Sequence, residues 1–323
     1  MADFNKTASA KSAIRASGSD IHTSENFKLA LARGLDMVWK RDFETPKQGM
    51  NLLFEDSIKQ ETASYQTFRT LGGVTPQNRD ADEMEFITRA DGFGFTVKTY
   101  NFRQAIAIER TLEEVDDVGV IRGLQADLAE NGKMTIEYAI ADMFNRGVNP
   151  SNAPVLADDG MYLIDTDRPN ANPAAGTWSN QETASAITPT SLWTAQLNAR
   201  QMTDENGRLY PQYIKKLVIR PDDEKTVQEI LNSQLDPTNA MNTTNTMYKK
   251  FEYIVYDYLT DACIYYLMDD PKSEKNEARF YWRVRPGFET WKEQPDVTNQ
   301  RVRFAFGLGL GCPRKMFRGG EVS

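Results

Sequence analysis

The sequence predicts an α+β fold, in which helices and strands are mixed without a regular strand–helix–strand repeat. Three observations lead to this class: a hairpin signal between residues 84 and 99, a long helical pattern over about residues 116–146, and several strand patterns in the last third of the chain. The 323 residues are enough for one large or two medium domains with a sizeable core.

The predicted hairpin joins two strand patterns, residues 84–88 and 93–99, through a turn at residues 90–92. Apolar and polar side chains alternate in the second strand, and the Asp-Gly pair in the connection favours a turn. Polar residues dominate from Thr75 to Glu85. The segment is therefore either an ordinary exposed hairpin or an arm that lies on a neighbouring copy of the same chain.

A helix is predicted to follow the hairpin over about residues 116–146. Two aspartates at residues 116–117 suit its first turn, because the helix dipole favours negative charge there. The apolar stripe comprises Ile121, Leu124, Leu128, Ile136, Ile140, Met143 and Phe144. Gly132 predicts a bend or a break, since glycine costs about 1 kcal/mol in a helix interior. Gly147 and Pro150 end the pattern.

The N-terminal part of the chain has two different patterns. Residues 1–23 are small and polar, which predicts an extended arm or mobile tail. Ser24 can cap a helix whose apolar residues recur at helical spacing as far as Trp39. A second short helix is predicted over residues 51–60.

The middle of the chain alternates between loops and regular elements. Residues 149–190 are rich in Pro, Asn, Gly and Asp and are expected to form long surface connections. A helix is predicted over residues 189–202 and a buried strand over 215–220. Pro221 then suits the first position of another helix, and residues 232–250 have a loop composition.

Strand patterns return at residues 253–258, 263–268, 279–285 and 302–310. The last of these alternates most clearly. Its apolar face carries Val302, Phe304, Phe306, Leu308 and Leu310. Its other face is basic and then bare at two glycines, which allows another backbone to approach closely.

Composition excludes several classes of protein. Hydrophobic residues make up 40% and charged residues 26%, as in ordinary globular proteins. No stretch approaches the roughly 18 apolar residues of a membrane span, and the N-terminus lacks a signal-peptide pattern. The two cysteines, Cys263 and Cys312, offer no disulfide framework, so we expect synthesis in a reducing cytoplasm.

The inventory of chemical groups argues against an enzyme. The single histidine, His22, lies in the polar N-terminal stretch, and one histidine with two distant cysteines cannot form a zinc site. The glycines at 307, 309 and 311 lack the spacing of a dinucleotide fingerprint, and Gly132-Lys133 is not a P-loop. We therefore expect no catalytic, cofactor-binding or metal-binding residues.

Four groups of neighbouring carboxylates remain as candidates for acid–base work or for Mg²⁺ or Ca²⁺ binding. They are Glu113/Glu114/Asp116/Asp117, Asp158/Asp159, Asp222/Asp223 and Asp269/Asp270. Each group lies at a predicted helix start or turn, where acidic residues are common for structural reasons. We favour the structural interpretation for all four.

The run from Gly94 to Arg110, which closes on the acids at 113–117, resembles the major head subunits of tailed bacteriophages, especially the Mu-like type. In that family a hairpin arm passes through a strand of pattern phenylalanine–x–x–alanine or threonine–apolar–x–apolar to an acidic pair that opens a spine helix. Similar stretches follow at residues 217–221, 258–261, 265–271 and 307–311, although members usually carry tryptophan where Tyr265 stands. The resemblance covers about residues 25–318.

The resemblance implies the Hong Kong 97-type capsid fold. Its parts would be an N-terminal arm (1–65), an extended loop (66–104), a peripheral domain (105–180) with the spine helix, an axial domain (181–295) and a C-terminal strand (296–323) that returns to the peripheral domain. Copies of the chain would form hexamers and pentamers of an icosahedral shell around double-stranded DNA.

The same resemblance implies a location in the virion, after synthesis in the bacterial cytoplasm, and contacts with scaffold and portal proteins, with or without a decoration protein, but with no membrane. An encapsulin-type compartment with the same fold, which encloses an enzyme cargo, is the alternative. A carboxylate- or metal-dependent hydrolase is a remote alternative.

Five basic residues, Arg301, Arg303, Arg314, Lys315 and Arg318, stand in a stretch without acids, although the net charge of the chain is -8. They either pair with acids elsewhere, including those at 113–117, or pair across subunits or face packaged DNA. Lys98 is the lysine available in the loop for a covalent crosslink of the kind some relatives form. We expect no crosslink, because it also needs a suitably placed acid and partner.

Overall fold

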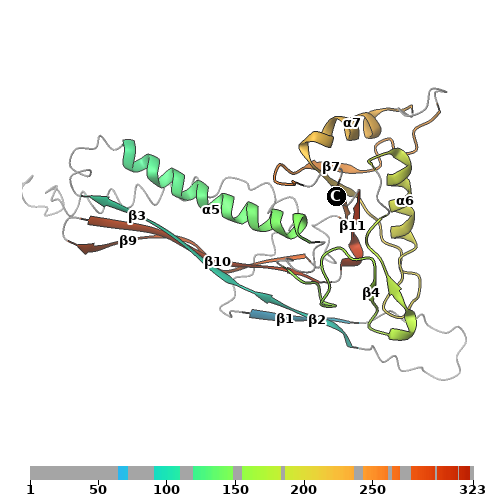
Figure 1. Cartoon of the computed structure of the whole chain (residues 1–323), viewed down its shortest axis with the longest axis horizontal. Coiled ribbons are helices and arrows are strands. Elements are labelled where there is room, and N and C mark those ends of the chain that lie inside the picture. Colours follow the sequence, from blue (N-terminus) through green and yellow to red (C-terminus); the bar gives the residue numbers. More distant parts are fainter. Residues whose placement is uncertain are drawn as a thin grey trace, which may run out of the picture. The chain divides into compact units, whose positions relative to one another are not determined.

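The computed structural model describes residues 65–71, 91–109, 119–147, 155–182, 186–235, 243–260, 264–269, 278–294, 297–311 and 313–320 (Figure 1). The predicted N-terminal arm, the helices expected at 25–39 and 51–60, the strand expected at 84–88 and the acids at 113–117 lie outside the described residues. So do His22 and both cysteines.

The chain divides into two compact units. One contains residues 1–45, 104–131 and 288–302, and the other contains residues 46–103, 132–287 and 303–323. The division falls inside four regular elements, so each of these elements contributes residues to both units.

Strand β1 (Tyr65–Leu71) pairs antiparallel with β2 (Asp91–Lys98). The sequence did not predict β1, and the turn expected at residues 90–92 is wrong, because Asp91 and Gly92 belong to β2 and Asp91 pairs with Leu71. Turn-forming residues also occur at strand ends, where the backbone ladder to a distant strand decides the conformation. The strand predicted over 93–99 is confirmed by β2.

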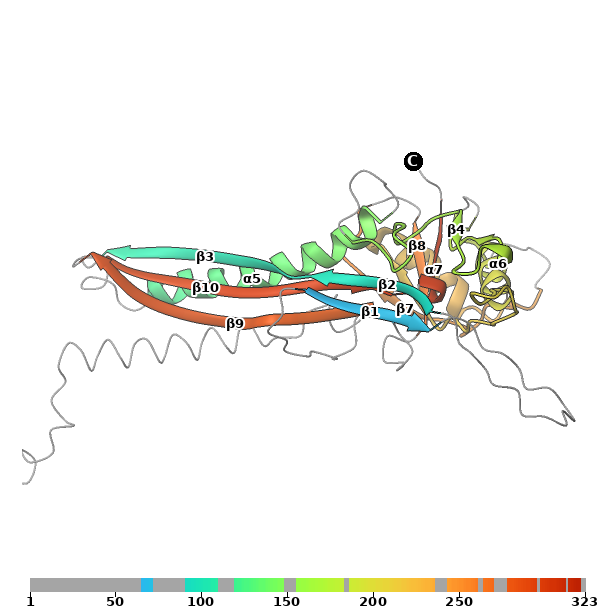
Figure 2. The same cartoon turned by 90° about the horizontal axis from the view of Figure 1, so that it is seen from below.

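Three long strands form a second sheet in the order β3 (Tyr100–Glu109), β10 (Val297–Leu310) and β9 (Ala278–Gln294), drawn in Figure 2. Both β9 and β10 are longer than the sequence predicted. Aromatic rings pack across the three strands: the Phe306 ring centroid lies 4.8 Å from that of Phe102 and 5.2 Å from that of Phe280. Such cross-strand pairs stabilise extended ladders where propensity alone is weak.

The bare face predicted for β10 is confirmed at Gly307. A Cβ atom placed on this residue would lie 2.6 Å from the carbonyl oxygen of Lys98 and 3.0 Å from Cγ1 of Val97. The backbone between β2 and β3 therefore crosses β10 at a distance that only glycine permits.

Helix α5 (Gly119–Asn145) confirms the long helix, but the break expected at Gly132 is wrong, since the helix is continuous. Gly132 is buried, and burial of the neighbouring side chains offsets the weak helix propensity of glycine. In the second half of α5, the Tyr266 hydroxyl donates to the Phe144 carbonyl (2.7 Å), and the two rings meet edge to face at 5.0 Å.

Tyr266 belongs to a four-stranded sheet with the order β11 (Met316–Gly319), β8 (Tyr265–Met268), β6 (Lys216–Ile219) and β7 (Glu252–Val255). The pair β6–β7 is parallel, and the other two are antiparallel. Short β11 follows the 3₁₀ turn η3 (Pro313–Lys315) and was not predicted, because four residues carry too little pattern.

Two helices share the core of this sheet, α6 (Pro189–Arg200) and α7 (Glu224–Asn232), and both confirm predicted helices. Pro221 begins a 3₁₀ turn, η2 (Pro221–Asp223), that leads directly into α7. Residues from α6, α7, β6, β8 and β11 form one buried cluster that includes Leu192, Leu217, Val227, Leu267 and Phe317.

The expectation that residues 149–190 form surface connections is wrong for part of the segment. In residues 155–182, which the structure describes, regular structure is limited to β4 (Arg168–Pro169), the 3₁₀ turn η1 (Pro173–Ala175) and β5 (Thr177–Trp178). Nevertheless Leu163, Arg168 and Asn180 are fully buried. The polar composition supplies hydrogen bonds to an irregular buried backbone, which composition alone cannot distinguish from a solvated loop.

The close approach at Gly307 generates a stability prediction. We expect Gly307→Ala to lower the free energy of unfolding by roughly 1–3 kcal/mol, because the new methyl group overlaps the Lys98 carbonyl. Gly287→Ala in β9 is the matched control, since its Cβ would meet nothing closer than 3.9 Å. Chemical denaturation of the unassembled chain measures both. Equal stabilities for the two variants would contradict the proposed contact.

Candidate functional site

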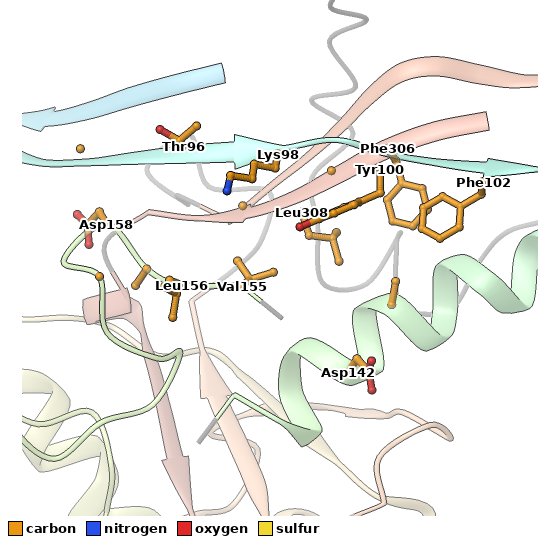
Figure 3. A pocket seen from close by; sticks show the side chains of 16 residues that line it. Thr96, Lys98, Tyr100, Phe102, Asp142, Val155, Leu156, Asp158, Phe306 and Leu308 are labelled. Atoms are coloured by element: carbon orange, nitrogen blue, oxygen red, sulfur yellow. The ribbon is translucent and has the colours of Figure 1, made fainter. Parts of the chain in front are cut away.

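A cavity of about 500 Å³ lies against β2, β3 and β10, with residues from the second half of α5 and from the 155–160 segment on its other side (Figure 3). Its apolar lining includes Phe102, Phe306, Leu308, Val155 and Leu156. Its polar lining includes Thr96, Lys98, Asp142 and Asp158. All these residues belong to one compact unit.

The polar side chains that line the cavity have different surroundings. Asp142 accepts a hydrogen bond from Arg146 one turn later on α5 (3.0 Å), so its carboxylate is engaged in a surface ion pair. Lys98 is exposed and Asp158 is buried. Within the described ranges, no three His, Cys, Asp or Glu side chains are grouped to hold a metal ion. The cavity therefore has the character of an apolar recess with a polar rim.

The basic residues from 301 to 318 separate into two kinds. Arg301 is partly exposed, donates from Nε to Glu289 Oε2 (2.7 Å) and lies over the Trp291 ring at 5.0 Å. Arg303 and Lys315 are half-buried. Pairing with an acid elsewhere in the chain is thus confirmed for Arg301.

Arg314 and Arg318 are buried inside the subunit, so the expectation that they face DNA or a neighbouring subunit is wrong. Arg314 donates to Glu205 Oε1 (2.9 Å), to Asn170 Oδ1 (2.6 Å) and to the Thr203 carbonyl. Its guanidinium carbon lies 4.4 Å from the centre of the Trp178 ring. A buried guanidinium is stable only with such a complete set of acceptors, which sequence position does not reveal.

The burial of a third arginine, Arg168, was not anticipated from the sequence. It binds Asp159 through two hydrogen bonds, Nη2 to Oδ1 (2.7 Å) and Nε to Oδ2 (2.9 Å), and both side chains are almost fully inaccessible. It also donates to the carbonyls of Tyr162 and Leu163, and it lies 5.1 Å from the Trp178 ring. An arginine and a tryptophan in an otherwise small and polar segment were the available signal.

Those members of the four carboxylate groups that lie among the described residues form ion pairs or stand at turns, helix starts and strand ends. Asp159 serves Arg168, and Asp222 and Asp223 begin η2 and α7 beside Arg220, as the sequence predicted. Burial raises the pKa of Asp223, with an opposing effect of Arg220. The Asp269 amide donates to the Lys315 carbonyl, and Asp270 lies outside the described residues.

Two further acids are buried in contacts with uncharged groups. The Tyr256 hydroxyl donates to Glu137 on α5, and burial next to this carboxylate raises the pKa of Tyr256. Glu182 accepts two hydrogen bonds from Asn198 Nδ2 (2.8 and 2.9 Å), and burial raises the pKa of its carboxyl. Neither acid lines the cavity.

No helix in the described ranges combines the length and the apolar character needed to cross a membrane.

The model of the family described as "Phage capsid protein" matches residues 93–319, which is more than half of the chain. No curated protein matches the chain.

Solved structures of low sequence identity share the fold. The capsid of the native GTA particle has a TM-score of 0.54 at 10% identity and covers 86% of this chain and 91% of that chain. The bacteriophage JBD30 capsid has a TM-score of 0.53 at 12% identity and covers 67% and 92%. Microbacterium phage Oxtober96 has a TM-score of 0.51 at 9% identity and covers 85% and 91%.

The buried pair of Asp159 and Arg168 generates a prediction. We expect Asp159→Ala to lower the free energy of unfolding by about 3–5 kcal/mol, because it leaves a buried guanidinium without its carboxylate. Glu229→Ala removes an exposed partner of Lys225 and should cost less than about 0.5 kcal/mol. Chemical denaturation of the unassembled variants compares them, and similar losses would contradict the role given to Asp159.

The raised pKa of Glu182 predicts a pH dependence of stability. The folded protein holds this proton in a pH range where the unfolded chain has released it, so stability falls as pH rises through that range. We expect the free energy of unfolding of Glu182→Gln to fall less than that of the unaltered chain between about pH 4 and about pH 7. Denaturation at several pH values tests this. Parallel curves for the two proteins would refute it.

Proposed function

Because the chain belongs to the phage capsid protein family, we propose that it assembles as hexamers and pentamers into the icosahedral shell that encloses the double-stranded DNA of a tailed phage. As a phage major capsid protein it is a structural protein of the virion that associates with copies of itself. The observation that carries the proposal is the family match over residues 93–319, together with the fold shared with chains of solved capsids.

We propose the Hong Kong 97-type organisation for the parts of the chain. Residues 1–65 serve as the N-terminal arm, 66–104 as the extended loop, 105–180 as the peripheral domain, 181–295 as the axial domain and 296–323 as the returning C-terminal strand. Helix α5 is the spine helix in this scheme. Its 27 residues and the paired strands β1 and β2 support the scheme, because both have the expected place in the chain order.

The proposed shell encloses DNA without binding it tightly. A net charge of -8 opposes bulk attraction to phosphate, and Arg314 and Arg318 are buried within the subunit. Arg301 is held by Glu289. Scaffold and portal proteins, with or without a decoration protein, are the further partners in this proposal, and synthesis takes place in the host cytoplasm.

Electron microscopy of the purified chain, with absorbance at 260 and 280 nm on the same fraction, tests the proposal. We expect the purified chain to form closed shells or ring-shaped capsomers, and we expect native particles to contain nucleic acid. A monodisperse monomer or dimer under assembly conditions would contradict the shell function. Shells that contain a protein cargo in place of nucleic acid would identify an encapsulin-type compartment.

A further inference from the structure

Helix α6 carries apolar side chains on two opposite sides. Leu192, Ala195 and Ala199 are fully buried in the core of the four-stranded sheet. Trp193 and Leu197, spaced by four residues on the other side, remain 45% and 43% exposed. A helix on the surface of a finished structure normally presents polar residues to solvent. The outer side of α6 is therefore an apolar surface that the described residues of the subunit leave exposed.

The segment after α6 extends this surface. The Tyr210 amide donates to the Met202 carbonyl (2.7 Å) and the Gln212 amide donates to the Ala199 carbonyl (3.0 Å), so the segment is fixed beside the end of the helix. The Tyr213 ring lies beneath the Arg200 guanidinium at 5.9 Å. The outer α6 surface comprises Trp193, Leu197, Arg200, Leu209, Tyr210 and Tyr213.

Exposed apolar side chains are concentrated on this surface. Five of the eleven large apolar side chains that the described residues expose belong to the outer α6 surface. Isolated exposed apolar residues need no explanation, but contiguous patches mark interaction sites. Tryptophan, tyrosine and arginine are also the residues that supply most of the binding energy in protein interfaces.

We propose that the outer α6 surface binds a second copy of this chain, through a different and acidic surface of that copy. The inference rests on the proposed shell function, and it identifies residues that form one contact between subunits of the shell. The contact is heterologous, and repeated heterologous contacts form a ring when the rotation between neighbouring subunits closes.

The charges beside the outer α6 surface indicate that it binds a different surface of the second copy. Arg200 and Lys250 flank the aromatic side chains, and the Lys250 ammonium lies 4.6 Å from the Trp193 ring. If two outer α6 surfaces met each other, these cations would face their own copies, and like charges across an interface oppose binding. The chain as a whole carries 46 acidic and 38 basic residues, and Asp127 and Glu130 are exposed on α5, outside the outer α6 surface. A second copy therefore offers acidic groups to these cations.

The test compares variants of exposed residues. Trp193→Ser and Leu197→Ser remove parts of the outer α6 surface. Leu235→Ser is the matched control, because Leu235 is 49% exposed and pairs with Thr244 in an isolated β-bridge after α7, outside this surface. Arg200→Glu reverses the charge, and Arg200→Lys retains it. Circular dichroism and thermal unfolding of unassembled subunits first establish that each variant folds.

Light scattering and electron microscopy then measure the concentration at which rings or shells form. We expect Trp193→Ser, Leu197→Ser and Arg200→Glu to raise this concentration roughly tenfold or more, and Leu235→Ser and Arg200→Lys to leave it nearly unchanged. Amide hydrogen exchange should also show residues 189–213 protected in assembled particles relative to unassembled subunits.

The outcomes distinguish this inference from the shell function. If the unaltered chain forms neither rings nor shells, the shell function fails. If it assembles, and Trp193→Ser and Leu197→Ser assemble like the control, the inference is overturned and the shell function stands. Normal assembly of these variants with loss of a co-purifying protein would assign the surface to that protein and also overturn the inference.

Discussion

The ion pair between Arg168 and Asp159 is the interaction on which the most irregular part of the subunit depends. Residues 155–182 contain only two-residue strands and one 3₁₀ turn, yet several of them, including Leu163, Arg168 and Asn180, are fully buried. Buried backbone groups need partners, and here side chains supply them. Arg168 serves two carbonyls, and Asn180 bridges the Leu163 carbonyl to the Met316 carbonyl of β11.

This arrangement joins segments that are far apart in the chain. Trp178 lies within cation–π distance of both Arg168 and Arg314, and Arg314 in turn binds Asn170 and Glu205. The C-terminal residues are thereby held beside the segment that precedes α6. Since α6 packs on the same core, the position of its outer surface depends indirectly on these buried charges. A subunit that meets several neighbours benefits from surfaces fixed in this way, because contact geometry must repeat from copy to copy.

A different constraint governs the extended strands. The stacked rings of Phe102, Phe280 and Phe306 bind three strands from distant parts of the sequence, and the bare position at Gly307 lets the Lys98 backbone cross β10. The recess lined by Phe306 and Leu308 lies beside this crossing (Figure 3). Side-chain volume is thus concentrated at some positions of β10 and removed at another, which is how one strand serves both a packed face and a close backbone contact.

The sequence alone determined the elements whose patterns are long or have clear boundaries. Helices α5, α6 and α7, strand β2, the alternation of β10 and its bare face all followed from periodicity, capping and glycine placement. The resemblance to phage head subunits also came from the order of such motifs, and the family match agrees with it. These features depend on backbone propensities and side-chain periodicity, which neighbouring residues in the sequence determine.

Only the tertiary structure decided the features that depend on distant partners. The partner of β2 is β1, residues 65–71, because strand pairing is set by long-range register. The continuity of α5 through Gly132 depends on packing that propensity does not include. Arg314 and Arg318 looked like surface charges in sequence. They are buried because acceptors from elsewhere in the fold surround Arg314, and because β11, which carries Arg318, lies between β8 and residues 180–182. Burial depends on the whole tertiary fold of the subunit, so it cannot be inferred from a short segment of the sequence.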